Sequence, residues 1–164
     1  MQHVQKEAFE AAATPKRRER LVIIGNGMSP GRALEKLFEA APDAYEVTIF
    51  NAEPRVNYDR IMLSPVLSGE KTFDEIVIHG DGWYVDHGVT LYKGHRIVAI
   101  DRDAKTVTSD QGAVEPYDKL VIATGARCDT SGIAGANQSH VFTLHTLDDA
   151  ERMRRFLAEL KRIW

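Results

Sequence analysis

Apolar runs and their spacing divide the first part of the chain into strands and a helix. Continuous apolar runs at 21–24 and 47–50 predict strands that are buried on both faces. Between them, apolar positions recur every three or four residues over 32–41, which predicts an amphipathic helix that Pro42 ends. Strand, helix and strand in this order predict a βαβ unit whose two strands lie parallel.

The middle of the chain gives weaker patterns. Residues 51–72 have no sustained period and are interrupted by prolines, so we expect a long functional loop there. Short apolar segments separated by polar turns predict a small antiparallel meander after it. The expected elements are a short helical stretch near 82–87, strands at 89–92, 97–100, 106–108 and 114–117, and a second buried strand at 119–123.

The two ends of the chain differ in character. Thr146 can cap a C-terminal helix, and Asp148 and Asp149 suit the positive end of that helix. The start of the chain is a polar lead ending in a basic cluster, which we interpret as a solvated extension, with a docking arm as the alternative. The expected organisation is an extension at 1–20, an α/β domain at 21–145 and a helix at 146–164.

Composition and charge narrow the class of protein. A chain of 164 residues with 43% hydrophobic residues can bury one ordinary core. Its formal net charge of -3 offers no basic field for nucleic acid, and it has no apolar run long enough to cross a bilayer. Cys128 alone can form neither an internal disulfide nor a metal site. We therefore expect a cytoplasmic protein without a metal, nucleic-acid partner or membrane partner.

A glycine-rich turn joins the first strand to the first helix. It has the pattern G-x-G-x-x-P-G, and backbone N–H groups in such a turn can bind a pyrophosphate at the positive end of a helix. Pro30 replaces the usual third glycine, so we expect helix–strand packing to suffer more than phosphate binding. A structural glycine turn is the alternative. The candidate cofactor-binding residues are Gly25, Gly27, Met28, Ser29, Pro30 and Gly31.

Polar side chains follow the second strand. Glu53 lies about twenty residues after the glycine turn, where Rossmann units place the acid that binds the adenosine ribose. Asn51, directly after the strand, competes for this role, and Glu53 as a solvated turn residue is the structural alternative. No basic residue follows Phe50 directly, which favours a free ribose hydroxyl over a 2′-phosphate.

Residues 57–71, NYDRIMLSPVLSGEK, contain the most specific motif. Together with the glycine turn and the segment VTIFNAEP at 47–54, this motif resembles the flavin domain of the NAD(P)H-dependent nitrite reductase large subunit. That subunit belongs to the pyridine nucleotide-disulfide oxidoreductase superfamily. The resemblance runs from about residue 21 to the C-terminus. It implies a Rossmann-like FAD-binding domain whose βαβ unit holds the ADP half of FAD.

The resemblance also implies binding residues outside the βαβ unit. Ala123, Thr124 and Gly125 match the Ala-Thr-Gly signature of the superfamily, where small residues let the backbone approach the cofactor. Ile97 would contact the adenine end through its backbone. Arg60 would lie near the flavin or its phosphates, with a surface salt bridge as the alternative. No residue of this chain is assigned a catalytic role.

The sequence departs from its superfamily in two respects. Ser64 and Pro65 stand where some branches have a reactive cysteine and others have Leu-Ser-Lys, so thiol chemistry is not expected. The second glycine turn of the superfamily, which belongs to its NAD(P)H domain, and its returning Gly-Asp strand do not occur in these residues. We therefore expect part of an FAD site, no nicotinamide site and a C-terminal helix that leads towards the absent NAD(P)H domain.

Three functions follow from these expectations. The first, which the resemblance implies, is the FAD-binding part of an oxidoreductase that passes electrons from NAD(P)H through FAD to a downstream acceptor. Alternatively, the chain is a non-catalytic module that binds a flavin or nucleotide. The third is a remnant whose open sheet edge docks on a partner subunit or a second copy that completes the sheet.

Overall fold

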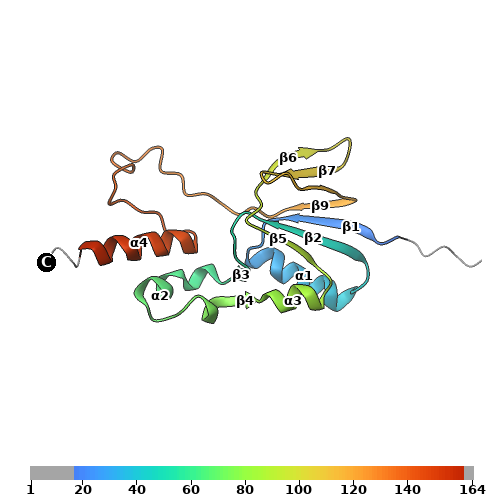
Figure 1. Cartoon of the computed structure of the whole chain (residues 1–164), viewed down its shortest axis with the longest axis horizontal. Coiled ribbons are helices and arrows are strands. Elements are labelled where there is room, and N and C mark those ends of the chain that lie inside the picture. Colours follow the sequence, from blue (N-terminus) through green and yellow to red (C-terminus); the bar gives the residue numbers. More distant parts are fainter. Residues whose placement is uncertain (1–16, 161–164) are drawn as a thin grey trace, which may run out of the picture.

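A four-stranded parallel sheet forms the centre of the computed structural model, which describes residues 17–160 (Figure 1). Its strands lie in the order β5-β2-β1-β9, and every neighbouring pair is parallel. The predicted α/β fold with a parallel sheet is therefore confirmed. The strands are β1 (Glu19–Ile24), β2 (Tyr45–Asn51), β5 (Thr90–Lys93) and β9 (Lys119–Ile122).

Helix α1 (Met28–Ala40) connects β1 to β2 and completes the predicted βαβ unit. It begins before the predicted range of 32–41 because Pro30 fits a first helical turn, where its missing N–H has no intrahelical partner. Leu34 is fully buried between the helix and the sheet. The apolar face predicted from the spacing is therefore the face that packs.

Side chains of β1 alternate between two hydrophobic clusters, one on each face of the sheet. The first cluster lies on the side of α1 and α3 (Asp81–Asp86) and includes Leu21, Ile23, Leu34, Ile49 and Tyr84. The second lies on the opposite face and includes Val22, Ile24, Phe50, Val107 and Tyr117. Burial on both faces explains why the apolar run of β1 has no polar interruption.

The predicted meander is a three-stranded antiparallel sheet, in the order β6-β7-β8. Val107 of its central strand packs in the second cluster, so the meander covers the face of the parallel sheet opposite α1 (Figure 1). His95, just before the meander, donates its backbone N–H to the carbonyl of Asn51 at 2.9 Å. The strands are β6 (Ile97–Asp101), β7 (Thr106–Ser109) and β8 (Val114–Pro116).

Strand β9 corrects the prediction of a second buried strand at 119–123. Val121 is 42% exposed and Ile122 is 63% exposed. The strand pairs with β1 on one edge, and within residues 17–160 no element pairs with its other edge. An apolar run indicates side chains suited to burial, whereas burial itself depends on which elements cover the strand.

Residues 51–72 contain regular secondary structure where a long loop was predicted. Pro65 fits the first turn of a short helix, and Gly69 ends that helix in a left-handed conformation with φ +84°. Leu63 and Val66 are one helical turn apart and bury the same face. The helix is too short to show a sustained period. The elements of this region and the next are β3 (Asn57–Tyr58), a 3₁₀ helix (Arg60–Met62), α2 (Leu63–Ser68), a 3₁₀ helix (Asp74–Ile76) and β4 (Val77–His79).

Helix α4 (Leu147–Leu160) confirms the predicted C-terminal helix and its cap. Thr146 Oγ1 accepts a hydrogen bond from Asp149 N at 3.2 Å, and Asp149 Oδ2 accepts one from Thr146 N at 3.0 Å. Leu147 is buried in a third cluster with Leu63 of α2, so α4 lies against α2 (Figure 1). No helix within residues 17–160 is long and apolar enough to cross a membrane.

The amino ends of β1 and β9 are joined by a charged contact. Asp118 Oδ2 accepts hydrogen bonds from Arg20 N at 2.7 Å and from the guanidinium of Arg17 at 2.8 Å. The backbone N–H of Asp118 donates in turn to the carbonyl of Arg20. These bonds, the backbone bond from Arg20 first, hold the pKa of Asp118 well below its usual range. The end of the predicted extension therefore belongs to the sheet, while residues 1–16 lie outside the described residues.

Candidate functional site

A cavity of about 500 Å³ lies where the carboxyl ends of β1, β2 and β9 meet. Crevices at this edge of an open parallel sheet are the usual ligand sites of α/β folds. All of the predicted cofactor-binding residues except Gly31 line it. Its lining residues are Ile24, Gly25, Asn26, Gly27, Met28, Ser29, Pro30, Phe50, Asn51, Ala52, Glu53, Arg60, His95, Arg96, Ile97, Ala123, Thr124, Gly125 and His145.

Gly25 joins three strands at the start of the glycine turn. Its backbone N–H donates to Phe50 O at 2.8 Å, at the end of β2. Its φ of +109° is one that residues with a side chain rarely adopt, and a Cβ there would lie 2.2 Å from Ala123 O. A glycine is therefore required here by the close approach of β9 to the turn.

Gly27, unlike Gly25, is not required by a close contact. A Cβ at this position would meet no described heavy atom within 4 Å, and its φ of -84° suits any residue. The first turn of α1 has no acidic residue, and Gly27 offers no side-chain cap. Because the first N–H groups of a helix have no intrahelical acceptors, this end of α1 can bind an anion.

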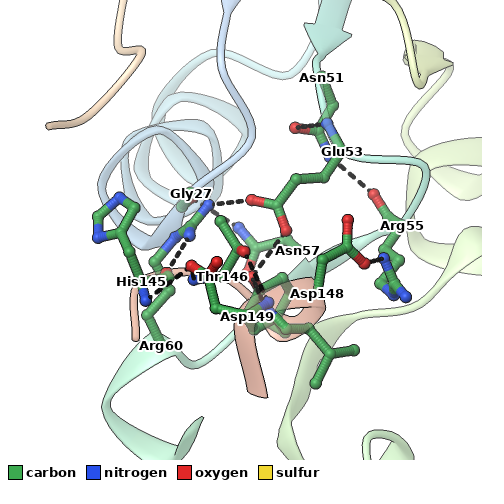
Figure 2. Close-up of polar contacts among 12 residues, drawn as sticks. Gly27, Asn51, Glu53, Arg55, Asn57, Arg60, His145, Thr146, Asp148 and Asp149 are labelled. Atoms are coloured by element: carbon green, nitrogen blue, oxygen red, sulfur yellow. Dashed lines mark hydrogen bonds and ion pairs between the residues drawn. The ribbon is translucent and has the colours of Figure 1, made fainter. Parts of the chain in front are cut away.

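Two amide side chains fix the glycine turn through hydrogen bonds. Asn26 is buried and exchanges hydrogen bonds with the hydroxyl of Tyr84 at 3.0 and 3.2 Å. Burial raises the pKa of Tyr84, so its hydroxyl keeps its proton. Asn57 donates from Nδ2 to the carbonyl of Gly27 at 2.7 Å (Figure 2). The conformation of the turn is therefore fixed by side chains as well as by its own backbone.

Glu53 is the one acid among the described residues that line the cavity, and its carboxylate is held by two neighbours. Its carboxylate accepts a hydrogen bond from the hydroxyl of Tyr58 at 2.7 Å and forms an ion pair with Arg60 (Figure 2). Burial, with the bond to Glu53 as a second cause, raises the pKa of Tyr58, so this hydroxyl stays protonated and donates. The side chain of Glu53 is only 15% exposed, unlike a solvated turn residue. Each oxygen keeps acceptor capacity for a further donor.

Arg60 connects Glu53 to a segment far along the chain. Its Nη1 donates to the carbonyl of His145 at 2.8 Å, just before α4 (Figure 2). The hydroxyl of Tyr58 also accepts a hydrogen bond from Leu147 N at 3.1 Å. The acid at the cavity and the start of α4 are therefore parts of one hydrogen-bonded network.

Asn51 uses its amide in local structure. Its Nδ2 donates to Arg55 O at 2.7 Å, and its Oδ1 accepts from Glu53 N at 3.3 Å. These bonds shape the turn after β2 and set the direction of Glu53. Of the two candidates for a ribose hydroxyl, Glu53 therefore has the greater free acceptor capacity.

The segment before β6 forms another wall of the cavity. His95 and Arg96 both line it, next to Ile97. Asp110 fixes the backbone of this segment, since its Oδ1 accepts from Arg96 N at 3.0 Å and its N–H donates to Arg96 O at 2.8 Å.

Within residues 17–160, no group of three or more His, Cys, Asp and Glu residues could hold a metal ion.

A sequence profile of the family described as Pyridine nucleotide-disulphide oxidoreductase matches residues 19–163. The match covers most of the chain. The chain belongs to the pyridine nucleotide-disulphide oxidoreductase family. The resemblance to this family predicted from the sequence is therefore confirmed.

Two curated relatives are much longer than the chain. The Assimilatory nitrate reductase electron transfer subunit of Bacillus subtilis (strain 168) is 38% identical over 137 residues, covering 84% of this chain and 18% of that protein. The Nitrite reductase (NADH) large subunit of Escherichia coli (strain K12) is 35% identical over 144 residues, covering 87% of this chain and 17% of that protein. The chain thus spans less than a fifth of each relative.

The fold is also that of a solved reductase. The ferredoxin reductase for the CYP199A2 system from Rhodopseudomonas palustris matches with a TM-score of 0.77 at 25% sequence identity. The match covers 87% of this chain and 35% of that chain. The chain therefore has the fold of about a third of that reductase.

Gly31 differs from the other predicted binding residues because it lies outside the cavity lining. A Cβ at Gly31 would lie 2.5 Å from Asn57 Nδ2 and 3.2 Å from His79 Cε1. Pro30, which stands at the position of the usual third glycine, is buried in the first turn of α1. Gly31, one position later, provides the close contact, towards β3 and β4.

Several lining residues were not predicted from the sequence. His95 and Arg96 directly precede Ile97, so their position next to an expected binding residue could have identified them. Asn26 lies between the two glycines of the turn and could have been found in the same way. His145 is different, because it is 85 residues from Arg60 and no local motif connects the two.

Proposed function

We propose that this chain is the FAD-binding domain of an NAD(P)H-dependent oxidoreductase of the nitrite reductase or ferredoxin reductase type. One observation carries the proposal. The glycine turn at the start of α1, the acid after β2 and the small residues after β9 line the same cavity of about 500 Å³. Membership of the pyridine nucleotide-disulphide oxidoreductase family, and relatives named as nitrite reductases, support it.

The chemistry of the cavity fits a dinucleotide. The uncapped start of α1 offers backbone N–H groups to the phosphates, and Gly27 leaves room for them. Glu53 offers acceptors to the ribose hydroxyls of adenosine. The segment of His95, Arg96 and Ile97 would contact the adenine. The backbone of Ala123 and Thr124 approaches the turn closely at Gly25, which supports a role for these residues beside the phosphates.

The chain positions the cofactor, and the cofactor supplies the redox chemistry. When bound, FAD would supply the hydride-accepting and electron-transferring chemistry of such an oxidoreductase. The residues that line the cavity would bind the phosphates and adenosine and orient the cofactor. Arg60 and Glu53 form an ion pair at the cavity wall. Each charge is compensated by the other, and the pair holds both side chains in place.

Ligand titration with a charged variant tests this proposal. Gly27→Asp adds a carboxylate at the phosphate end of the cavity, and its Cβ would meet no described heavy atom within 4 Å. An aspartate before a helix is also a good N-cap, so the variant should be slightly more stable than the wild type. We expect calorimetry to show binding of FAD and ADP to the wild type, weaker binding of FMN, and at least a tenfold (~1.4 kcal/mol) loss of FAD affinity in Gly27→Asp.

Gly82→Asp is the matched control. It adds the same charge at an exposed glycine of α3 where no described atom lies within 4 Å of the new Cβ. This variant should bind FAD like the wild type. Absence of FAD and ADP binding in the wild type, or equal FAD affinity in Gly27→Asp, would contradict the proposal.

A further inference from the structure

Asn57 is a fully buried polar residue behind the glycine turn. Its side chain is 1% exposed and lies in β3, outside the cavity lining. Its Nδ2 donates to Gly27 O at 2.7 Å (Figure 2). Its Oδ1 is buried without a hydrogen-bond partner among the described residues. An unpaired buried oxygen destabilises a fold, so packing alone does not explain an asparagine at this position.

The surroundings of Asn57 are built to admit its amide. Gly31 lies directly against it, and a Cβ there would come within 2.5 Å of Nδ2. His79 closes the same space, with its Nε2 paired to Glu35 Oε1 at 2.8 Å and its ring stacked on Trp83 at 4.1 Å. These contacts hold the amide of Asn57 against the turn.

The bond to Gly27 sets the direction of the next peptide group. Gly27 O accepts from Asn57 Nδ2 and also from Gly31 N at 3.2 Å. The peptide between Gly27 and Met28 is trans, as are all described peptides. In a planar trans peptide the N–H points away from the C=O. The Met28 N–H therefore points away from Asn57, on the side where Met28 and Ser29 line the cavity.

We propose that Asn57 is a positioning residue for the phosphates of the bound dinucleotide. It fixes the peptide between Gly27 and Met28 so that the Met28 N–H faces a phosphate, and it does not touch the cofactor itself. The inference rests on the proposed function, because it assumes that the cavity binds a dinucleotide.

Two ligands and two variants of the 164-residue chain separate this role from a structural one. ADP has a pyrophosphate, whereas adenosine shares only the nucleoside. Asn57→Leu removes the donor and the unpaired oxygen, and Asn57→Asp keeps the shape but removes the donor. We expect both variants to lose about tenfold in ADP affinity, measured by calorimetry. Adenosine affinity, measured by NMR titration, should stay at the wild-type value.

Stability provides an independent readout. Asn57→Leu should keep or raise the urea midpoint of the ligand-free chain, because it removes an unpaired buried oxygen. Val66→Ala, in the third cluster, is the opposite control and should lower the midpoint while leaving ADP affinity unchanged. A purely structural role for Asn57 would make its variants behave like Val66→Ala.

The outcomes distinguish the two proposals. If the wild type binds neither FAD nor ADP, the proposed function fails, and this inference fails with it. If the wild type binds ADP and the Asn57 variants bind it equally well, or lose ADP and adenosine affinity by the same factor, only the inference fails. If Asn57→Leu does not fold, Asn57→Asp and Gly31→Ala provide the test. The Cβ of Gly31→Ala displaces the same amide. The inference then stands if these variants lose ADP affinity and keep adenosine affinity, and it fails if both affinities change by the same factor.

Discussion

Strands β1 and β9 lie side by side with similar apolar sequences and very different surroundings. From Leu21 to Ile24, β1 is buried at every position. In β9, the register partner of Ile24 is Ile122, which is 63% exposed. The two strands share a ladder of backbone hydrogen bonds, so the difference lies in what packs on their side chains.

The comparison shows that the two strands depend on different neighbours. Helix α1 and the meander cover the two faces of β1, whereas β9 has its main contact with β1 along one edge. The strands nevertheless meet tightly at the cavity, where Gly25 at the end of β1 touches the backbone of Ala123. We therefore expect the contribution of β9 to be concentrated at its two ends.

The largest expected effect is at the glycine that ends β1. Gly25→Ala should cost about 1–3 kcal/mol for its positive φ and about 1–3 kcal/mol more for overlap with Ala123 O. Gly125→Ala, after β9, also has a positive φ but meets no described atom, so only the first cost applies. Urea unfolding of both variants measures the difference, and equal losses would show that β9 does not press on the turn.

Truncation of matched isoleucines is the next test. Ile23→Ala in β1 should lower the free energy of unfolding by about 2–5 kcal/mol, because the surrounding core cannot fill the space. Ile122→Ala in β9 removes the same atoms from an exposed position and should cost less than about 1 kcal/mol. Chemical unfolding followed by tryptophan fluorescence gives both values. A similar loss at the two positions would mean that β9 is covered in solution.

The smallest expected effect is the pH dependence of stability that comes from the charged contact at the amino ends of β1 and β9. Arg20 and Arg17 hold the pKa of Asp118 below its unfolded value, so the contact stabilises the fold above about pH 4 and is lost as the pH falls further. Asp118→Asn should lower the urea midpoint at pH 7. Wild-type and variant midpoints should approach each other progressively as the pH falls below about 4. A constant gap between them at all pH values would exclude the carboxylate as its cause.

Local patterns were sufficient to predict the core of this fold. The apolar runs of β1 and β2, the spacing of α1 and the cap at Thr146 all correspond to observed elements. The prediction was wrong where burial depends on distant parts of the chain, as at β9. It also missed α2, because a helix of six residues is too short to show a period.

The candidate site was predictable to a similar degree. The glycine turn and Glu53 follow from their spacing, and the structure brings both to one cavity. The network from Glu53 through Arg60 to His145 depends on the placement of α4, which no local motif specifies. The same holds for Asn57, whose bond to Gly27 joins residues 30 positions apart. Such contacts arise only once the chain is folded.

The central claim is that the cavity at the carboxyl ends of β1, β2 and β9 binds FAD. Amide NMR spectra of the ¹⁵N-labelled chain, recorded with and without FAD, test it most directly. The account predicts the largest shifts at 25–29, 51–53 and 95–97, with little change near Asp118 at the opposite ends of the same strands. No shifts on addition of FAD, or shifts centred on the amino ends of β1 and β9, would contradict it.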